Sequence, residues 1–255
     1  MAYHETNLQK IKKLVIDPRK NAHKIIPFIK NKIFPYQRDF YEFFGSEKYS
    51  KPYLAQDLLI KYLDQKNGFF VQCGGNDGYS SDPTYFLEKF LNWTGIIIEP
   101  LPIYYLCQRN RKKSKVYNHA AVSFDYERDD ISFFDCHGMS IVKDSIPNQE
   151  EWLRSGELAQ DITAREISVV AKPVQTAIDD YFSDHPVRQI DLLVADVEGY
   201  ELNVLKGLDF VKNSPIQIMV EIHTPERKKD IDAYLKERGY QFVAELYTND
   251  FLYKK

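Results

Sequence analysis

From about Gly68 onward, short apolar runs alternate with amphipathic segments of helix length. Four apolar runs are too short for helices and are bounded by Gly, Pro or charged residues, so they predict buried strands at 69–73, 96–98, 191–195 and 216–220. Apolar residues at helical spacing predict helices at 85–90, 103–107, 202–208 and 231–235. Strands that alternate with helices form right-handed βαβ units, so we expect a parallel sheet with helices on both faces.

Two segments depart from this alternation. Residues 240–253 predict a pair of strands that closes the sheet, with Asn249 and Asp250 as the turn. The segment 135–170 breaks the rhythm, and we expect it to be an insertion over the active face. The chain then divides into a helical N-terminal extension at 1–66 and an α/β domain at 67–255.

The charges of the chain are unevenly distributed. The 34 Lys and Arg against 37 Asp and Glu give a formal net charge of −3, which is unlike a generally basic nucleic-acid binder, so we expect no nucleic-acid partner. Residues 1–52 carry a net charge of +6 and many aromatic residues, which leaves −9 for the rest. We expect a helical lid whose lysines are solvated; the alternative is peripheral contact of residues 1–52 with a membrane surface or a polyanion.

The cysteines and the absence of long apolar runs bear on location. Cys73, Cys107 and Cys136 form no close-spaced pair, which favours a reducing compartment. The sequence has no apolar stretch typical of a signal peptide and no run long enough to span a membrane. We therefore expect a soluble, cytoplasmic protein, with the inner membrane face as the place of any peripheral contact.

The ends of the predicted strands are where ligands bind in open α/β sheets. The first strand ends in the glycine turn, Gly74-Gly75-Asn76-Asp77-Gly78, where glycine allows a sharp turn and close approach to a ligand. This turn is not a GxGxxG motif and has no phosphate-binding Lys, which disfavours a pyrophosphate ligand. Glu99 ends the second strand about twenty residues later, where a carboxylate can bind both ribose hydroxyls. The pair fits a nucleoside-type cofactor such as S-adenosylmethionine; the alternatives are a plain tight turn and a structural Glu.

An ordered set of motifs resembles the FkbM family of S-adenosylmethionine-dependent methyltransferases. The runs that carry the resemblance are 70–78, 95–100, 118–123, 196–201 and 249–252, and together they extend from about Gly68 to Tyr253. The resemblance implies a class I methyltransferase fold, a seven-stranded mostly parallel sheet with one antiparallel strand. It also implies O-methylation. The methylated hydroxyl would belong to a sugar, to a glycan, or to a small molecule that is glycosylated or is a polyketide.

The resemblance and the strand ends together define the expected cofactor site. Its residues are Gly74, Gly75, Asn76, Asp77, Gly78, Glu99, Pro100, His119, Ala120 and Asp196. His119 and Ala120 stand where the family contacts adenine, although His119 is equally consistent with a partly exposed loop histidine. One departure is Gln72, because many methyltransferases have an acidic residue at this position.

Two pairs of polar residues are candidates for catalysis. Asp196 with Glu198, and Glu221 with His223, follow the third and fourth strands, and a spacing of two directs each pair to one side of an extended backbone. We expect His223 to be the base that removes the hydroxyl proton, because its ordinary pKa lies near neutral pH. In a less favoured alternative Asp196, Glu221 and His223 bind a divalent cation, and in a purely structural one the carboxylates only anchor turns.

Other features of the sequence have weaker implications. Residues 137–140 are either part of the acceptor pocket or an ordinary turn. We expect the basic run 111–113 to be a solvated helix end and Cys73 to be a small buried residue. Two other functions stay open at this point: an NAD-type reductase, and a catalytically inactive binding module that uses the basic N-terminal arm.

Overall fold

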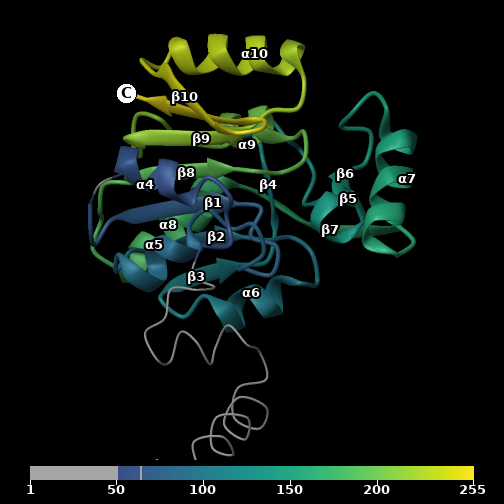
Figure 1. Cartoon of the computed structure of the whole chain (residues 1–255), viewed down its shortest axis with the longest axis horizontal. Helices are drawn as coiled ribbons and strands as arrows, with labels where there is room; N and C mark the ends of the chain where they lie inside the picture. The colour runs from purple at the N-terminus through teal and green to yellow at the C-terminus, as the bar shows by residue number, and fades with distance from the viewer. Residues whose placement is uncertain (1–50, 64) are drawn as a thin grey trace, which may run out of the picture. The chain divides into compact units, whose positions relative to one another are not determined.

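The seven strands of the central sheet run in the order β10-β11-β9-β8-β1-β2-β3 in the computed structural model, which describes residues 51–63 and 65–255 (Figure 1). Their bounds are β1 Phe69–Cys73, β2 Thr94–Ile98, β3 Ser114–Tyr117, β8 Leu192–Ala195, β9 Gln217–Glu221, β10 Gln241–Tyr247 and β11 Asp250–Lys254. β11 is antiparallel to both of its neighbours, and the other pairs are parallel. This is the predicted seven-stranded class I methyltransferase sheet, with one antiparallel strand.

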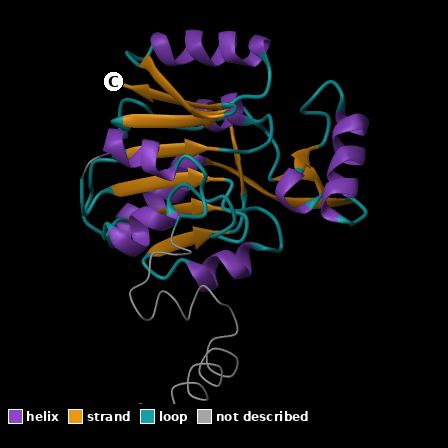
Figure 2. Cartoon of the chain, in the orientation of Figure 1, coloured by secondary structure: helices purple, strands orange, loops and turns teal. Residues whose placement is uncertain are grey.

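The central strands are apolar because both faces of the sheet are covered. In β1, Phe69 and Val71 face one buried cluster and Phe70 faces another. The first cluster includes side chains from α8 (Val174–Asp184), α9 (Glu201–Lys206) and α10 (Pro225–Lys236). The second includes side chains from α4 (Gln56–Leu63), α5 (Tyr85–Phe90) and α6 (Tyr104–Asn110). Figure 2 shows helices on both sides of the strands, as the alternation of strands and helices predicts.

The compact unit that contains the sheet begins at Pro52, earlier than the predicted boundary after residue 66. Tyr53, Leu59 and Leu63 are buried in the cluster that covers one face of the sheet. Residues 52–63 therefore belong to the α/β unit, because their apolar side chains complete its core. The predictions made for residues 1–50 lie outside the described residues.

A smaller sheet extends from the carboxyl ends of the parallel strands. It has the order β4-β7-β5-β6, with β4 at Ala120–Val122, β5 at Asp130–Asp135, β6 at Ile141–Val142 and β7 at Arg165–Pro173. The 3₁₀ helix η1 (His137–Met139) and helix α7 (Gln149–Gln160) complete it. Figure 1 shows this subdomain beyond the ends of the main sheet. The region around 135–170 was predicted to be irregular relative to the βαβ pattern, but its second sheet was not predicted.

The C-terminal hairpin has nearly the predicted position. β10 and β11 pair antiparallel, but Asp250 is the first residue of β11 and not part of the turn. Asn249 has a positive φ of 73°, a conformation that Asn tolerates better than most residues. Among the residues that the structure describes, no helix is both long and apolar enough to cross a lipid bilayer.

Candidate active site

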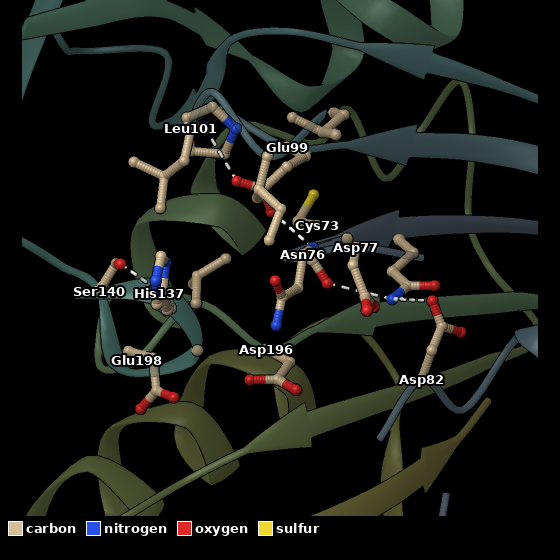
Figure 3. Close-up of a pocket in the computed structure, with 18 of the residues that line it drawn as sticks. Cys73, Asn76, Asp77, Asp82, Glu99, Leu101, His137, Ser140, Asp196 and Glu198 are labelled. Atoms are coloured by element: carbon tan, nitrogen blue, oxygen red, sulfur yellow. Dashed lines mark hydrogen bonds between the residues drawn. The ribbon is translucent and has the colours of Figure 1, made fainter. Parts of the chain in front are cut away.

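A cavity of about 600 Å³ lies at the carboxyl ends of the parallel strands (Figure 3). One wall is the glycine turn and the residues after it, up to Pro83, and another is formed by residues 98–103. The small sheet contributes His137, Gly138, Ser140, Val142 and Gln160. The fourth wall carries Asp196, Glu198 and Glu221, from the ends of β8 and β9. The cavity therefore lies at the edge where α/β folds bind their ligands.

Most of the residues predicted to bind a cofactor line this cavity. Those that do are Gly74, Gly75, Asn76, Asp77, Glu99, Pro100, Ala120 and Asp196. Gly78 and His119 are not among the lining residues. His119 is buried, with Nδ1 3.1 Å from the carbonyl oxygen of Ala120 and its ring 6.2 Å from that of Tyr117. The structure thus excludes the partly exposed loop histidine, and desolvation lowers the pKa of His119.

The glycine turn needs glycine because the backbone passes very close to other strands. Gly74 has a φ of +88°, and a Cβ there would overlap the carbonyl oxygen of Asp196. A Cβ on Gly75 would lie 2.3 Å from the side chain of Ile97. Asp77 closes the turn by accepting hydrogen bonds from the backbone N–H groups of Tyr79 and Ser80. Close packing of the backbone thus fixes the position of this cavity wall.

Glu99 joins the glycine turn to the second strand end. One carboxylate oxygen accepts a 2.7 Å hydrogen bond from the Asn76 N–H, and the other accepts a 2.9 Å bond from the Leu101 N–H. Burial raises the pKa of Glu99 to about 7, although the backbone N–H groups oppose this shift. Each carboxylate oxygen retains a lone pair that can accept from a ribose hydroxyl.

Gln72 is accompanied by a carboxylate that the sequence analysis missed. The Gln72 amide donates to the Gly74 carbonyl at 3.0 Å and to Asp82 Oδ2 at 3.3 Å, and both Gln72 and Asp82 line the cavity. Asp82 thus provides an acidic group next to Gln72, the position at which many methyltransferases have an acidic residue. Asp82 is ten residues from Gln72 in a polar turn, so spacing along one strand could not reveal it.

The prediction that residues 111–113 form a solvated helix end is wrong for Arg111. Its guanidinium is fully buried and donates to Glu88 at 3.0 Å, to Asp82 at 2.8 Å and to Thr84 at 2.8 Å. It also lies over the ring of Phe70, 5.2 Å from the ring centroid. Because Asp82 lines the cavity, Arg111 supports the cavity wall from behind.

The four candidate catalytic residues come together, but His223 does not line the cavity. Its Nε2 lies 3.2 Å from Glu198 Oε2 and 3.1 Å from Glu221 Oε2, so the ring bridges the two carboxylates. These contacts raise the pKa of His223 to about 10, and the imidazole is therefore protonated at neutral pH. A protonated histidine cannot accept the proton of a hydroxyl, which argues against His223 as the base.

Two of the carboxylates near His223, those of Glu198 and Asp196, have raised pKa values. Burial raises the pKa of Glu198 to about 7, against the lowering effect of His223. Burial and the neighbouring Glu221 and Glu198 raise the pKa of Asp196 well above its usual range. No Lys or Arg is among the described residues that line the cavity. Glu198 also has a φ of 53°, an uncommon conformation for a non-glycine residue. The turn that positions its carboxylate therefore has an energetically costly backbone conformation.

Two residues that sequence reasoning missed hold His223 in place. The ring of Trp152, on α7, lies 5.1 Å from the His223 ring. The Asn249 amide lies 3.2 Å from His223 Nδ1. Glu198, Glu221 and His223 each place one potential ligand atom within 4.8 Å of the others, whereas the cation alternative in the sequence analysis named Asp196, Glu221 and His223.

Some solved structures resemble the chain at low sequence identity. Solved structures that resemble the chain include precorrin-6y C5,15-methyltransferase from Geobacter metallireducens, with 11% identity, a TM-score of 0.41 and coverage of 78% of this chain and 87% of that chain. They also include human methyltransferase 10 domain containing protein, with 10% identity, a TM-score of 0.36 and coverage of 78% and 80%. At these TM-scores neither likeness adds to the argument.

No curated protein matches the chain in sequence. The family comparison is decisive, because a model described as the methyltransferase FkbM domain matches residues 72–242, more than half of the chain. The chain therefore belongs to the FkbM family of S-adenosylmethionine-dependent methyltransferases.

Proposed function

We propose that this protein is an O-methyltransferase that acts on a hydroxyl of a sugar, glycan or glycosylated or polyketide small molecule. The observation that carries the proposal is the difference between two walls of the cavity. Glu99 and residues 74–77 of the glycine turn line one wall, and Asp196, Glu198 and Glu221 line another. The first wall suits a nucleoside, and the second suits a group that must lose a proton.

The first wall suits S-adenosylmethionine in its hydrogen-bonding groups and in its charge. Gly74 and Gly75 let the chain turn where a Cβ would collide with Asp196 and Ile97, and Glu99 can accept from the ribose hydroxyls. The lack of Lys and Arg on the described lining is suited to a cofactor without phosphate and with a positively charged sulfonium. When bound, this cofactor supplies a methyl group to the acceptor oxygen, and its carbon–sulfur bond breaks as the new carbon–oxygen bond forms.

The protein must position the acceptor and take up the hydroxyl proton. Orientation contributes about 7–11 kcal/mol to such reactions, and a positioned base contributes about 10²–10⁴-fold in rate. The proton passes to the carboxylate cluster, of which Asp196 is closest to the glycine turn by virtue of its backbone contact with Gly74. His223 holds Glu198 and Glu221 in place from behind.

The test combines cofactor binding with an acceptor screen. Calorimetric titration is expected to show that the full chain binds S-adenosylmethionine, and mass spectrometry of a panel of glycosides and polyketides is expected to show a gain of one methyl group on oxygen. Asp196→Asn is expected to lower turnover by about 10²-fold or more and leave cofactor affinity nearly unchanged. Methylation on nitrogen or carbon alone, or full turnover by this variant, would contradict the proposal.

A further inference from the structure

Glu198, Glu221 and His223 form a group with the arrangement of metal ligands. Glu221 ends β9 and Glu198 follows the end of β8, and these strands are parallel neighbours in the sheet. Each residue offers one ligand atom, and the three atoms lie within 4.8 Å of one another. Two carboxylate oxygens and one imidazole nitrogen therefore converge on one point at the edge of the cavity.

The spacing of these atoms matches the coordination shell of a small divalent cation. In octahedral coordination with bonds of about 2.1 Å, neighbouring ligand atoms lie about 3.0 Å apart. His223 Nε2 lies 3.2 Å from Glu198 Oε2 and 3.1 Å from Glu221 Oε2. Glu198 and Glu221 also line the cavity, so a cation held by them would lie at its edge.

The charge around this point is incompletely balanced. Asp196 adds a third carboxylate to the group, and the described cavity lining contains no Lys or Arg. The nearby Arg227 is engaged elsewhere, because its guanidinium donates to the carbonyl oxygens of Gly199 and Ser145 and lies 3.7 Å from Glu201. Buried carboxylates are costly unless a cation pairs with them. One imidazole faces three carboxylates here.

One oxygen of the cluster has no hydrogen bond. Glu221 Oε2 is shielded from solvent and accepts no hydrogen bond of good geometry, and its contact with His223 Nε2 is the ion pair at 3.1 Å. Buried polar atoms without a hydrogen bond are rare in folded proteins. This oxygen is one of the three ligand atoms, and a bound cation would satisfy it.

The other side of the imidazole is also arranged as in a metal site. The Asn249 amide lies 3.2 Å from Nδ1, and the Trp152 ring lies against the His223 ring. Such partners fix the ring so that Nε2 faces the carboxylates, as the outer partners of metal-binding histidines do.

We propose that Glu198, Glu221 and His223 bind a divalent cation of the Mn²⁺ class. Carboxylate oxygens suit Mg²⁺ and Mn²⁺, and the added imidazole favours Mn²⁺ or Fe²⁺. Binding requires that His223 release its proton, so the cation takes the place of that proton between the carboxylates. This inference goes beyond the proposed function. A hydroxyl bound to the cation has a lowered pKa, and Asp196, which is not a ligand, accepts its proton.

The test measures binding of Mn²⁺ to the full chain at pH 8, using the electron paramagnetic resonance signal of free Mn²⁺. We expect one site per chain. Glu198→Gln and Glu221→Gln are each expected to weaken binding by about tenfold or more. Glu150→Gln, a change to an exposed carboxylate on α7, is the matched control and should leave the affinity unchanged.

Two further measurements, of thermal stability and of cofactor binding, complete the test. Mn²⁺ should raise the thermal midpoint of the wild type and not that of Glu198→Gln, which also checks that the variant folds. Absence of binding at millimolar MnCl₂, or equal binding by all the variants, would overturn the cation site. Titration of S-adenosylmethionine into the same samples separates the two proposals: cofactor binding without Mn²⁺ binding removes only the cation site, and the reverse removes only the proposed function.

Discussion

Two charged clusters, one around Arg111 and one around His223, differ in how completely their polar groups are hydrogen-bonded. Around Arg111, the guanidinium is 0% exposed and its carboxylate partners Asp82 and Glu88 are each 2% exposed. Arg111 donates to both carboxylates and to Thr84. Around His223, the side chains of His223, Glu198 and Glu221 are 24%, 16% and 20% exposed, and one buried oxygen accepts no hydrogen bond.

The difference separates a structural role from a chemical one. A buried charge whose partners are all present stabilises one arrangement and has no capacity for a further ligand. The His223 cluster faces the cavity, has Asp196 as a third carboxylate near one imidazole, and includes Glu221 Oε2, which accepts no hydrogen bond of good geometry. It therefore has the capacity to take up a proton or a cation, whereas the Arg111 cluster fixes the wall beside which that chemistry occurs.

The largest expected effect comes from breaking the satisfied cluster. Arg111→Met leaves the Asp82 and Glu88 carboxylates buried without a cation, and removing one partner of such a cluster costs about 3–5 kcal/mol of the free energy of unfolding. Urea denaturation, followed by circular dichroism, measures this loss.

The neighbouring Lys112→Met is the control for Arg111→Met. Lys112 is exposed, so the change should alter stability by less than about 0.5 kcal/mol. If Arg111→Met unfolded at the same urea concentration as the wild type, the buried cluster would not support the fold in the way the contacts indicate.

Glu99 is an intermediate case that sharpens the comparison. Its oxygens accept from backbone N–H groups, as in a satisfied cluster, yet they line the cavity. We expect Glu99→Ala to weaken S-adenosylmethionine binding by about tenfold or more, which corresponds to about 1.4 kcal/mol, measured by calorimetric titration. Glu99→Gln keeps the shape and one acceptor oxygen, so its loss should be smaller. Unchanged affinity in Glu99→Ala would remove the ribose assignment.

The smallest expected effect is a pH dependence that arises from the unsatisfied cluster. The pKa of Glu198 is raised to about 7, so its ionised carboxylate, which completes the cluster beside Asp196, is scarce at pH 6 and predominates at pH 8. Turnover is therefore expected to rise about tenfold between these values, with a midpoint near pH 7. Glu198→Gln should flatten this rise. A profile that falls with pH over the same range would contradict the assignment.

The sequence predicted the fold and much of the cavity because both depend on patterns along single segments. The apolar runs located β1, β2, β8 and β9 to within two residues at each end, and the ends of these strands contained Glu99, Asp196, Glu198 and Glu221. A parallel sheet brings the carboxyl ends of its strands to one edge, so residues near those ends were expected to meet.

Contacts between segments were decided only by the tertiary structure. Arg111 looks like one of three solvated basic residues along the chain, yet its guanidinium meets Asp82 and Glu88 in the interior. His223 has the residue type of a base, but the carboxylates that flank it keep it protonated. Burial and the set of neighbouring charges determine what an ionisable group does, and both arise from segments that are far apart in the sequence.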